Sequence, residues 1–185
     1  IATTRPETLL GDTAVAANPT DERYTSLVGK KVKLPLTGRV IPIIADAYVD
    51  KEFGTGLVKI TPAHDPNDFE VGNRHELERI NILNPDGTLS DAVPQKYRGM
   101  QALAARKVVL ADLAELGLLK SEEKVTHAVG HCYRCHTTVE PYLSKQWFVK
   151  MRPLADEALK AWEEGQVAFF PKKWENTYKH WLETI

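Results

Sequence analysis

Five polar side chains of the kinds that take part in hydrolysis gather within ten positions: Lys59, Thr61, His64, Asp65 and Asp68. Lys59 and Thr61 alternate along an apolar run, so a β-strand would point both side chains to the same face. A carboxylate, a hydroxyl and a cation at one point can position a water molecule for attack on an ester that is already labile. The spacing therefore predicts a small polar pocket for a small ligand.

Two other interpretations of this stretch remain open. His64, Asp65 and Asp68 are also residue types that bind divalent metals, although His75 is the single further ligand nearby and no second matching cluster follows. Asp65 can instead cap a helix that begins near Asp68, with a surface ion pair completing a purely structural role. A nucleophilic mechanism is disfavoured, because the chain has no Gly-x-Ser-x-Gly elbow and both cysteines lie in one CxxC motif.

The elements that would position these side chains are a glycine turn, a strand and a helix. Gly54 and Gly56 follow Phe53 and tolerate the positive φ of a tight turn. The apolar run from Leu57 to Ile60 predicts a strand that ends before Pro62. A helix is predicted over about 68–77, so the polar cluster falls at a strand-to-helix junction.

The rest of the first 124 residues is rich in short strands. Strands are predicted at 1–4, 31–36, 40–44 and 80–83, with a hairpin turn at Thr37-Gly38 and a turn at 84–87. A helix over 101–116 would bury Leu103, Leu110, Leu113 and Leu116 and end at Gly117. This order favours an α+β fold, mainly a barrel-like β domain with peripheral helices and a small C-terminal strand and helix appendage.

The chain is predicted to divide into three parts, with a boundary near Val125. These parts are a barrel-like β domain with helices at 1–124, a CxxC-containing stem at 125–152 with strands at 124–130 and 145–151, and a helical segment at 153–185. Helices are expected over 153–164 and 174–185. They carry Trp162, Trp174 and Trp181, and these large apolar side chains are expected to pack either against a partner outside this chain or against the barrel-like domain.

Composition excludes several classes of protein. The 185 residues are 43% hydrophobic and 26% charged, with a net charge of -1, so binding to nucleic acid would have to depend on local patches. No apolar run approaches the length that spans a bilayer, and no signal peptide is visible. Two cysteines do not make a disulfide scaffold, which favours a cytoplasmic setting. The first residue is not methionine, so the chain is expected to be a piece of a longer protein.

Cys132 and Cys135 form the second chemical signal. A CxxC pair supplies half of a tetrahedral zinc site, and the adjacent His131 and His136 lie too close in sequence to be expected as ligands of the same ion. A structural zinc and a simple metal-free turn both remain open for this segment.

Two long motifs carry a resemblance to a known family. The first is Thr3-Thr-Arg-Pro-Glu-Thr-Leu-Leu-Gly-Asp12 and the second is Gly54-Thr-Gly-Leu-Val-Lys-Ile-Thr-Pro-Ala-His-Asp-Pro-Asn-Asp-Phe69. In this order they closely resemble the editing domain, connective polypeptide 1, of the valyl-tRNA synthetases, which are class I aminoacyl-tRNA synthetases. The stretch Trp174-Glu-Asn-Thr-Tyr-Lys-His-Trp181 is similar to the return into the catalytic core of that family.

The resemblance implies a hydrolase that removes threonine from mischarged threonyl-tRNA(Val). Threonyl-adenylate is a second candidate substrate. A hydrophobic synthetic site cannot strongly reject threonine, which is nearly isosteric with valine. In valyl-tRNA synthetases this site prefers valine over threonine only about a hundredfold. A second pocket must select the hydroxyl, and valine would leave its buried polar groups unpaired at roughly 1–3 kcal/mol each. The partners implied are the CCA end of tRNA(Val) and the catalytic core of the full-length chain.

Roles for individual residues follow from the same resemblance. Asp65 and Asp68 would divide recognition of the ammonium and hydroxyl of the threonyl group, with Lys59 and Thr61 completing the catalytic pocket. The remaining substrate-binding residues implied by the family are Arg5, Thr8 and Phe53, which would hold the terminal adenosine, orient the water or wall the pocket.

The family also implies what the chain would not do. Neither ATP-binding signature of the synthetic core is present, so ATP binding and aminoacylation would belong to the parent enzyme. Editing would need no cofactor, and a structural zinc at Cys132 and Cys135 would concern the full-length protein. A non-catalytic docking module for the CCA end is the main alternative function, and a metal-dependent hydrolase is a weaker one.

Overall fold

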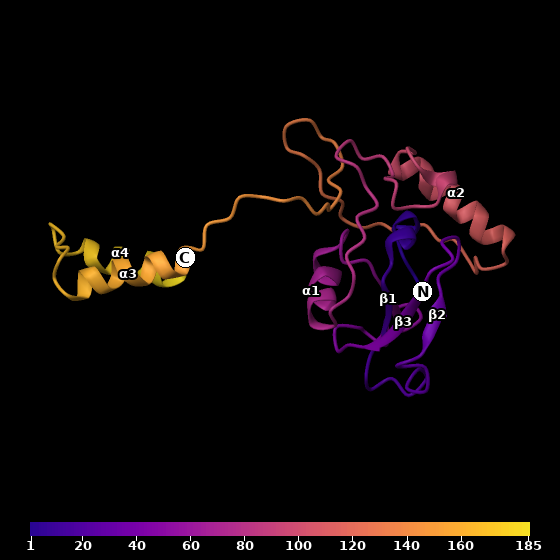
Figure 1. The fold of residues 1–185 in the computed structure, drawn as a ribbon, viewed down its shortest axis with the longest axis horizontal. Helices are drawn as coiled ribbons and strands as arrows, with labels where there is room; N and C mark the ends of the chain where they lie inside the picture. Colours follow the sequence, from indigo (N-terminus) through magenta and orange to yellow (C-terminus); the bar gives the residue numbers. More distant parts are fainter. The chain divides into compact units, whose positions relative to one another are not determined.

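The computed structural model describes all of Ile1–Ile185 and forms two compact units, Ile1–Leu143 and Ser144–Ile185 (Figure 1). The predicted division at 1–124, 125–152 and 153–185 uses other boundaries and stays a prediction. No helix in the chain is long and apolar enough to cross a bilayer.

The first unit is built on a four-stranded sheet of order β2-β3-β1-β4. Its strands are β1 (Ala14–Ala17), β2 (Lys31–Lys33), β3 (Val40–Ala45) and β4 (Leu57–Ile60). β1 pairs in parallel with β3 and antiparallel with β4, and the predicted hairpin is confirmed because β2 pairs antiparallel with β3. The sheet is open, since β2 and β4 do not pair with each other, so the predicted barrel-like closure is not confirmed.

Two helices complete the first unit. α1 (Pro66–Arg74) follows β4 and lies beside the strands (Figure 1). Val71 of this helix packs with Ala14, Ala16 and Ile60. At Gly72 the helix lies very close to Pro62, and a Cβ atom at this position would be 2.9 Å from Cγ of Pro62. Only glycine fits this contact, which fixes α1 against the end of β4.

α2 (Ala102–Glu115) covers a separate apolar cluster. The helix ends as predicted, with Gly117 at a φ of 68°. The predicted apolar face is wrong in part, because Leu103 and Leu116 are 59% and 57% exposed. The buried stripe instead consists of Ala102, Ala105, Val109, Asp112 and Leu113, where small residues let the helix lie close to the loops beneath it.

Four predicted strands do not form. Residues 80–83 make only a single bridge, between Leu83 and Leu89, and 124–130 and 145–151 have no ladder partner. Residues 1–4 are likewise outside any strand. These segments have no neighbouring strand with which to form a ladder, so strand propensity alone does not determine their structure. Two short 3-10 helices, η1 (Pro6–Gly11) and η2 (Gln95–Tyr97), lie among these loops.

The second unit is a helical hairpin of α3 (Met151–Glu163) and α4 (Trp174–Thr184). Tyr178 joins the two helices by donating to the backbone oxygen of Ala158 at 3.2 Å and by contacting the ring of Phe169. The predicted helices are confirmed, although α3 begins two residues before Pro153. Trp147, Phe170 and Trp181 remain largely exposed.

Candidate functional site

The predicted site residues of the central stretch meet where β4 passes into α1. Lys59 and Thr61 lie on the same face, as predicted, and the ammonium of Lys59 is 2.5 Å from the hydroxyl oxygen of Thr61. Asp68 comes from the first turn of α1, and one of its carboxylate oxygens accepts the backbone N–H of Thr61 at 2.8 Å. The junction therefore brings Lys59, Thr61 and Asp68 together.

A fourth member of this cluster, Asp12, was not singled out from the sequence. Its carboxylate accepts the Thr61 hydroxyl at 2.5 Å and lies 3.3 Å from Nζ of Lys59. Asp12 follows η1, and β1, which begins two residues later, pairs with β4, so the pairing carries it to the site. The sequence feature that could have identified Asp12 as a site residue is its position at the end of the first long motif.

The two buried carboxylates of the cluster are electrostatically unusual. Burial raises the pKa of Asp12 to about 6, although Lys59 and Thr61 act in the opposite direction. Burial also raises the pKa of Asp68 to about 6, and the Thr61 N–H opposes this shift only in part. Lys59 pairs with Asp12, and Asp68 has no lysine or arginine partner in the chain. Asp68 is thus a buried carboxylate that would gain from a cationic ligand.

Asp65 has the capping role that the sequence allowed. One carboxylate oxygen accepts the backbone N–H groups of Asn67 at 2.8 Å and Asp68 at 3.2 Å. The other oxygen has no partner in the chain, so capping α1 leaves half of the carboxylate available. The predicted surface ion pair is absent for both Asp65 and Asp68.

Arg5 reaches the same turn from the N-terminal side. Its guanidinium donates to the backbone oxygen of His64 at 2.8 Å and pairs with Glu140. Thr8 is buried, and its hydroxyl donates to the backbone oxygen of Arg5 at 2.9 Å. Phe53 is 70% exposed. The structure therefore brings Arg5 to the site, gives Thr8 a hydrogen bond to the backbone of Arg5, and leaves the ring of Phe53 open to solvent.

His64 is fully buried and is fixed by two backbone groups. Its Nε2 accepts the N–H of Ile82 at 2.9 Å, so Nδ1 carries the proton and donates to the oxygen of Pro141 at 3.0 Å. Burial lowers the pKa of His64 to about 4. Both ring nitrogens are occupied, and no group of three His, Cys, Asp or Glu side chains in the chain is arranged to hold a metal. His64 is therefore not free to bind a metal together with Asp65 and Asp68, which disfavours the metal interpretation.

We expect His64→Gln to lower the free energy of unfolding by about 1–3 kcal/mol at pH 7.5, because one buried backbone group loses its partner. The folded pKa of about 4 lies below the usual 6.5, so the stability from the neutral ring is present above pH 6.5 and lost as the pH falls through 4. Urea unfolding of the variant should therefore depend less on pH between 6.5 and 4. The same change at exposed His127 is the control, and an equal pH dependence in wild type and His64→Gln would contradict this role.

Cys132 and Cys135 lie on a tight turn between His131 and Thr138, which form an isolated bridge. The Thr137 hydroxyl lies 3.3 Å from Sγ of Cys135 and lowers the pKa of that thiol. The ring Nδ1 of His131 lies 3.0 Å from the backbone oxygen of His136. The two thiols can supply a pair of zinc ligands, and the chain offers no further ligand beside them.

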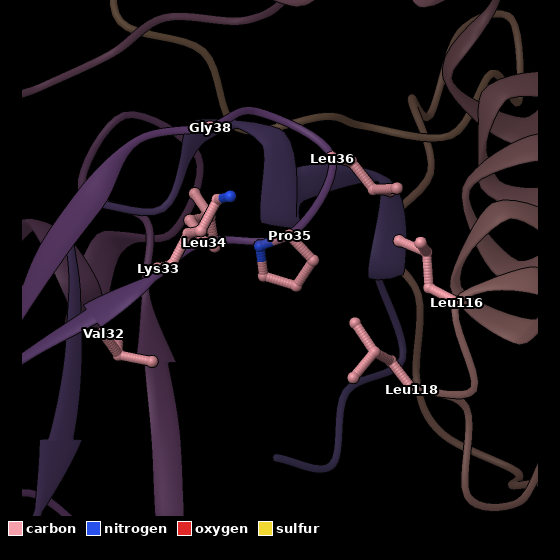
Figure 2. A pocket seen from close by; sticks show the side chains of 8 residues that line it. All are labelled: Val32, Lys33, Leu34, Pro35, Leu36, Gly38, Leu116 and Leu118. Atoms are coloured by element: carbon pink, nitrogen blue, oxygen red, sulfur yellow. The ribbon is translucent and has the colours of Figure 1, made fainter.

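A cavity of about 580 Å³ lies away from this cluster, between the β2–β3 loop and the end of α2 (Figure 2). Its walls are mostly apolar and include Val32, Leu34, Leu36, Leu116 and Leu118. None of the predicted site residues lines it. The polar cluster, and not this cavity, is therefore the candidate site.

Comparison with known proteins identifies the family. Residues 12–132 match the model described as "Leucyl-tRNA synthetase, editing domain". The chain belongs to this family of synthetase editing domains. Over its full length it is 70% identical to the valine–tRNA ligase of Treponema denticola and 60% identical to that of Carboxydothermus hydrogenoformans. The chain spans about a fifth of the length of these relatives, 20% and 21%.

A solved structure described as GlLeuRS-CP1 has the same fold. It is 14% identical, with a TM-score of 0.52 over 68% of this chain and 83% of that chain. The predicted membership of the class I editing domains is thus confirmed, and with it hydrolytic editing at the level of the family. The roles of individual residues remain predictions.

Proposed function

We propose that this editing domain hydrolyses the aminoacyl ester of threonyl-tRNA(Val), with threonyl-adenylate as a second substrate, within a valine–tRNA ligase. The observation that supports this most directly is Asp68, a buried carboxylate with no cationic partner and one oxygen free of hydrogen bonds within the chain. The α-ammonium of an aminoacyl group supplies the missing positive charge.

Selection of threonine over valine would come from the groups left unsatisfied around Asp68. Asp65 caps the turn that carries Asp68, and its free oxygen can accept the threonyl hydroxyl or share the ammonium. The hydroxyl hydrogen of Thr61 is donated to Asp12 and one lone pair accepts from Lys59, so Thr61 cannot also donate to the substrate and would act mainly by holding these groups in place. Valine would enter without offering a donor, which leaves a desolvated acceptor unpaired.

The reaction consumes one water molecule. Water attacks the ester carbonyl carbon, the bond from that carbon to the ribose oxygen breaks, and the ribose oxygen takes up a proton. Threonine and uncharged tRNA leave. A carboxylate with a pKa near 6 is largely ionised at neutral pH and can hold either the ammonium or the attacking water.

The experiment that tests this function compares threonyl-tRNA(Val) with valyl-tRNA(Val) as substrates of the full-length protein. We expect hydrolysis of the threonyl ester to be faster by at least tenfold, since one missing hydrogen bond in a site built for it costs about 1.4 kcal/mol or more. Equal hydrolysis of both esters would contradict a hydroxyl-selective pocket.

An assay of the isolated chain with mischarged tRNA distinguishes a hydrolase from a docking module for the CCA end. Slow release of threonine that depends on Asp68 supports an intrinsic hydrolase. Binding of mischarged tRNA without any release favours the docking module.

Hydrolysis should also survive a chelator. Because both nitrogens of His64 are occupied by backbone groups, we expect EDTA to change the rate of threonyl-tRNA hydrolysis by less than about twofold. The control is valine activation by the same enzyme in excess Mg²⁺ after removal of EDTA. A large loss of hydrolysis that added Zn²⁺ restores would favour the metal-dependent alternative.

A further inference from the structure

A short segment after the CxxC turn lies against the candidate site. We define Glu140–Leu143 as the strap. Its three contacts are the Glu140 carboxylate with Arg5, the Pro141 oxygen with Nδ1 of His64 at 3.0 Å, and the Leu143 oxygen with Nδ2 of Asn81 at 3.3 Å. The strap lies outside the residues 12–132 that match the family model, and so does Arg5.

Arg5 has two carboxylate neighbours of different character. Glu7, 3.8 Å from Nε of Arg5, is 1% exposed and is held by two hydrogen bonds of 2.8 Å from Arg106. Glu140 is 22% exposed and lies on backbone without regular secondary structure. Glu7 is therefore fixed in place, whereas the Glu140 side chain can leave Arg5 while the backbone bonds of Pro141 and Leu143 remain.

We propose that Glu140 is an exchangeable counter-ion, and that an RNA phosphate takes its place on Arg5 when the acceptor end enters the site. The proposal rests on the proposed function, which supplies RNA as the substrate. A guanidinium binds a phosphate through two parallel hydrogen bonds, as it binds a carboxylate, so one anion can replace the other. A phosphate beside Arg5 would also repel Glu140, and a partly exposed ion pair is weak enough to yield.

The test uses Glu140→Gln in the full-length protein, with two measurements. One is KM and kcat for threonyl-tRNA(Val) hydrolysis, and the other is the dissociation constant of uncharged tRNA(Val) ending in CCA. We expect KM and the dissociation constant to fall roughly twofold to fivefold with kcat unchanged, because the RNA no longer displaces a carboxylate. Glu123→Gln, on exposed irregular backbone, makes the same change in net charge and is the matched control.

Each outcome decides the role of Glu140. A rise in KM, or a fall in kcat, would show that Glu140 supports the geometry of Arg5, and that result would overturn the exchange. Equal values for Glu140→Gln and Glu123→Gln would overturn it as well. If wild-type protein does not hydrolyse threonyl-tRNA but Glu140→Gln still binds tRNA more tightly, the proposed function fails and the exchange stands.

Discussion

Replacement of Asp68 by asparagine is expected to reduce hydrolysis of threonyl-tRNA(Val) by about a hundredfold or more, the scale seen when one electrostatic partner of a transition state is removed. Asparagine has the same shape and can still accept the Thr61 N–H, so the start of α1 should be preserved. What is lost is the negative charge proposed to hold the substrate ammonium. Deacylation of mischarged tRNA by the full-length protein measures this effect.

The control for Asp68 is the same substitution at Asp91, which is exposed in a loop. Valine activation, which belongs to the proposed synthetic core, should be unchanged in both variants. Unchanged deacylation in Asp68→Asn would reject Asp68 as a substrate-binding or catalytic residue and would leave it as a structural partner of Thr61.

Replacement of Lys59 by methionine has the second large expected effect, because it removes the cation beside buried Asp12. Breaking a buried pair from one side typically lowers the free energy of unfolding by about 3–5 kcal/mol. The loss of stability in the variant should grow with pH. The pKa of Asp12 is raised from 3.8 to about 6 in the folded protein, so the contribution of this side chain to the free energy of unfolding is complete below pH 3.8 and is lost as the pH rises through 6.

Urea unfolding of Lys59→Met at pH 5 and pH 8 measures this dependence, with Lys107→Met on the exposed face of α2 as the control. We expect the loss of stability to be larger at pH 8, where Asp12 must lose its proton without Lys59. Deacylation should also fall, since Lys59 and Thr61 position the carboxylates. A stable variant with normal deacylation would show that Asp12 is satisfied without Lys59.

The parts of the structure that the sequence predicted correctly depend on short-range chemistry. The β2–β3 hairpin, the Asp65 cap of α1 and the end of α2 at Gly117 each involve residues only a few positions apart. Turn geometry and capping preferences decide such features locally. The common face of Lys59 and Thr61 is of the same kind, because strand alternation alone determines it.

The parts that could not be predicted depend on residues far apart in the sequence. Asp12 joins Thr61 across 49 positions, and His64 joins Pro141 across 77. No periodicity relates such residues. The barrel was inferred from a count of strand-like segments, yet some of those segments found no partner. The role of Phe53 follows from the resemblance alone and stays a prediction, because a solvent-exposed ring is free to stack on a base.

The strap has a consequence for the order in which the protein is made. All four strands and α1 are complete by Arg74, so they can fold while the rest of the chain is still being synthesised. Arg5 must wait for Glu140, 135 positions later, because contacts between distant residues form late. A nascent chain would therefore acquire its carboxylate cluster first and only afterwards cover Arg5. We expect Arg5 on a ribosome-bound chain to be open to any nearby RNA until the strap has emerged.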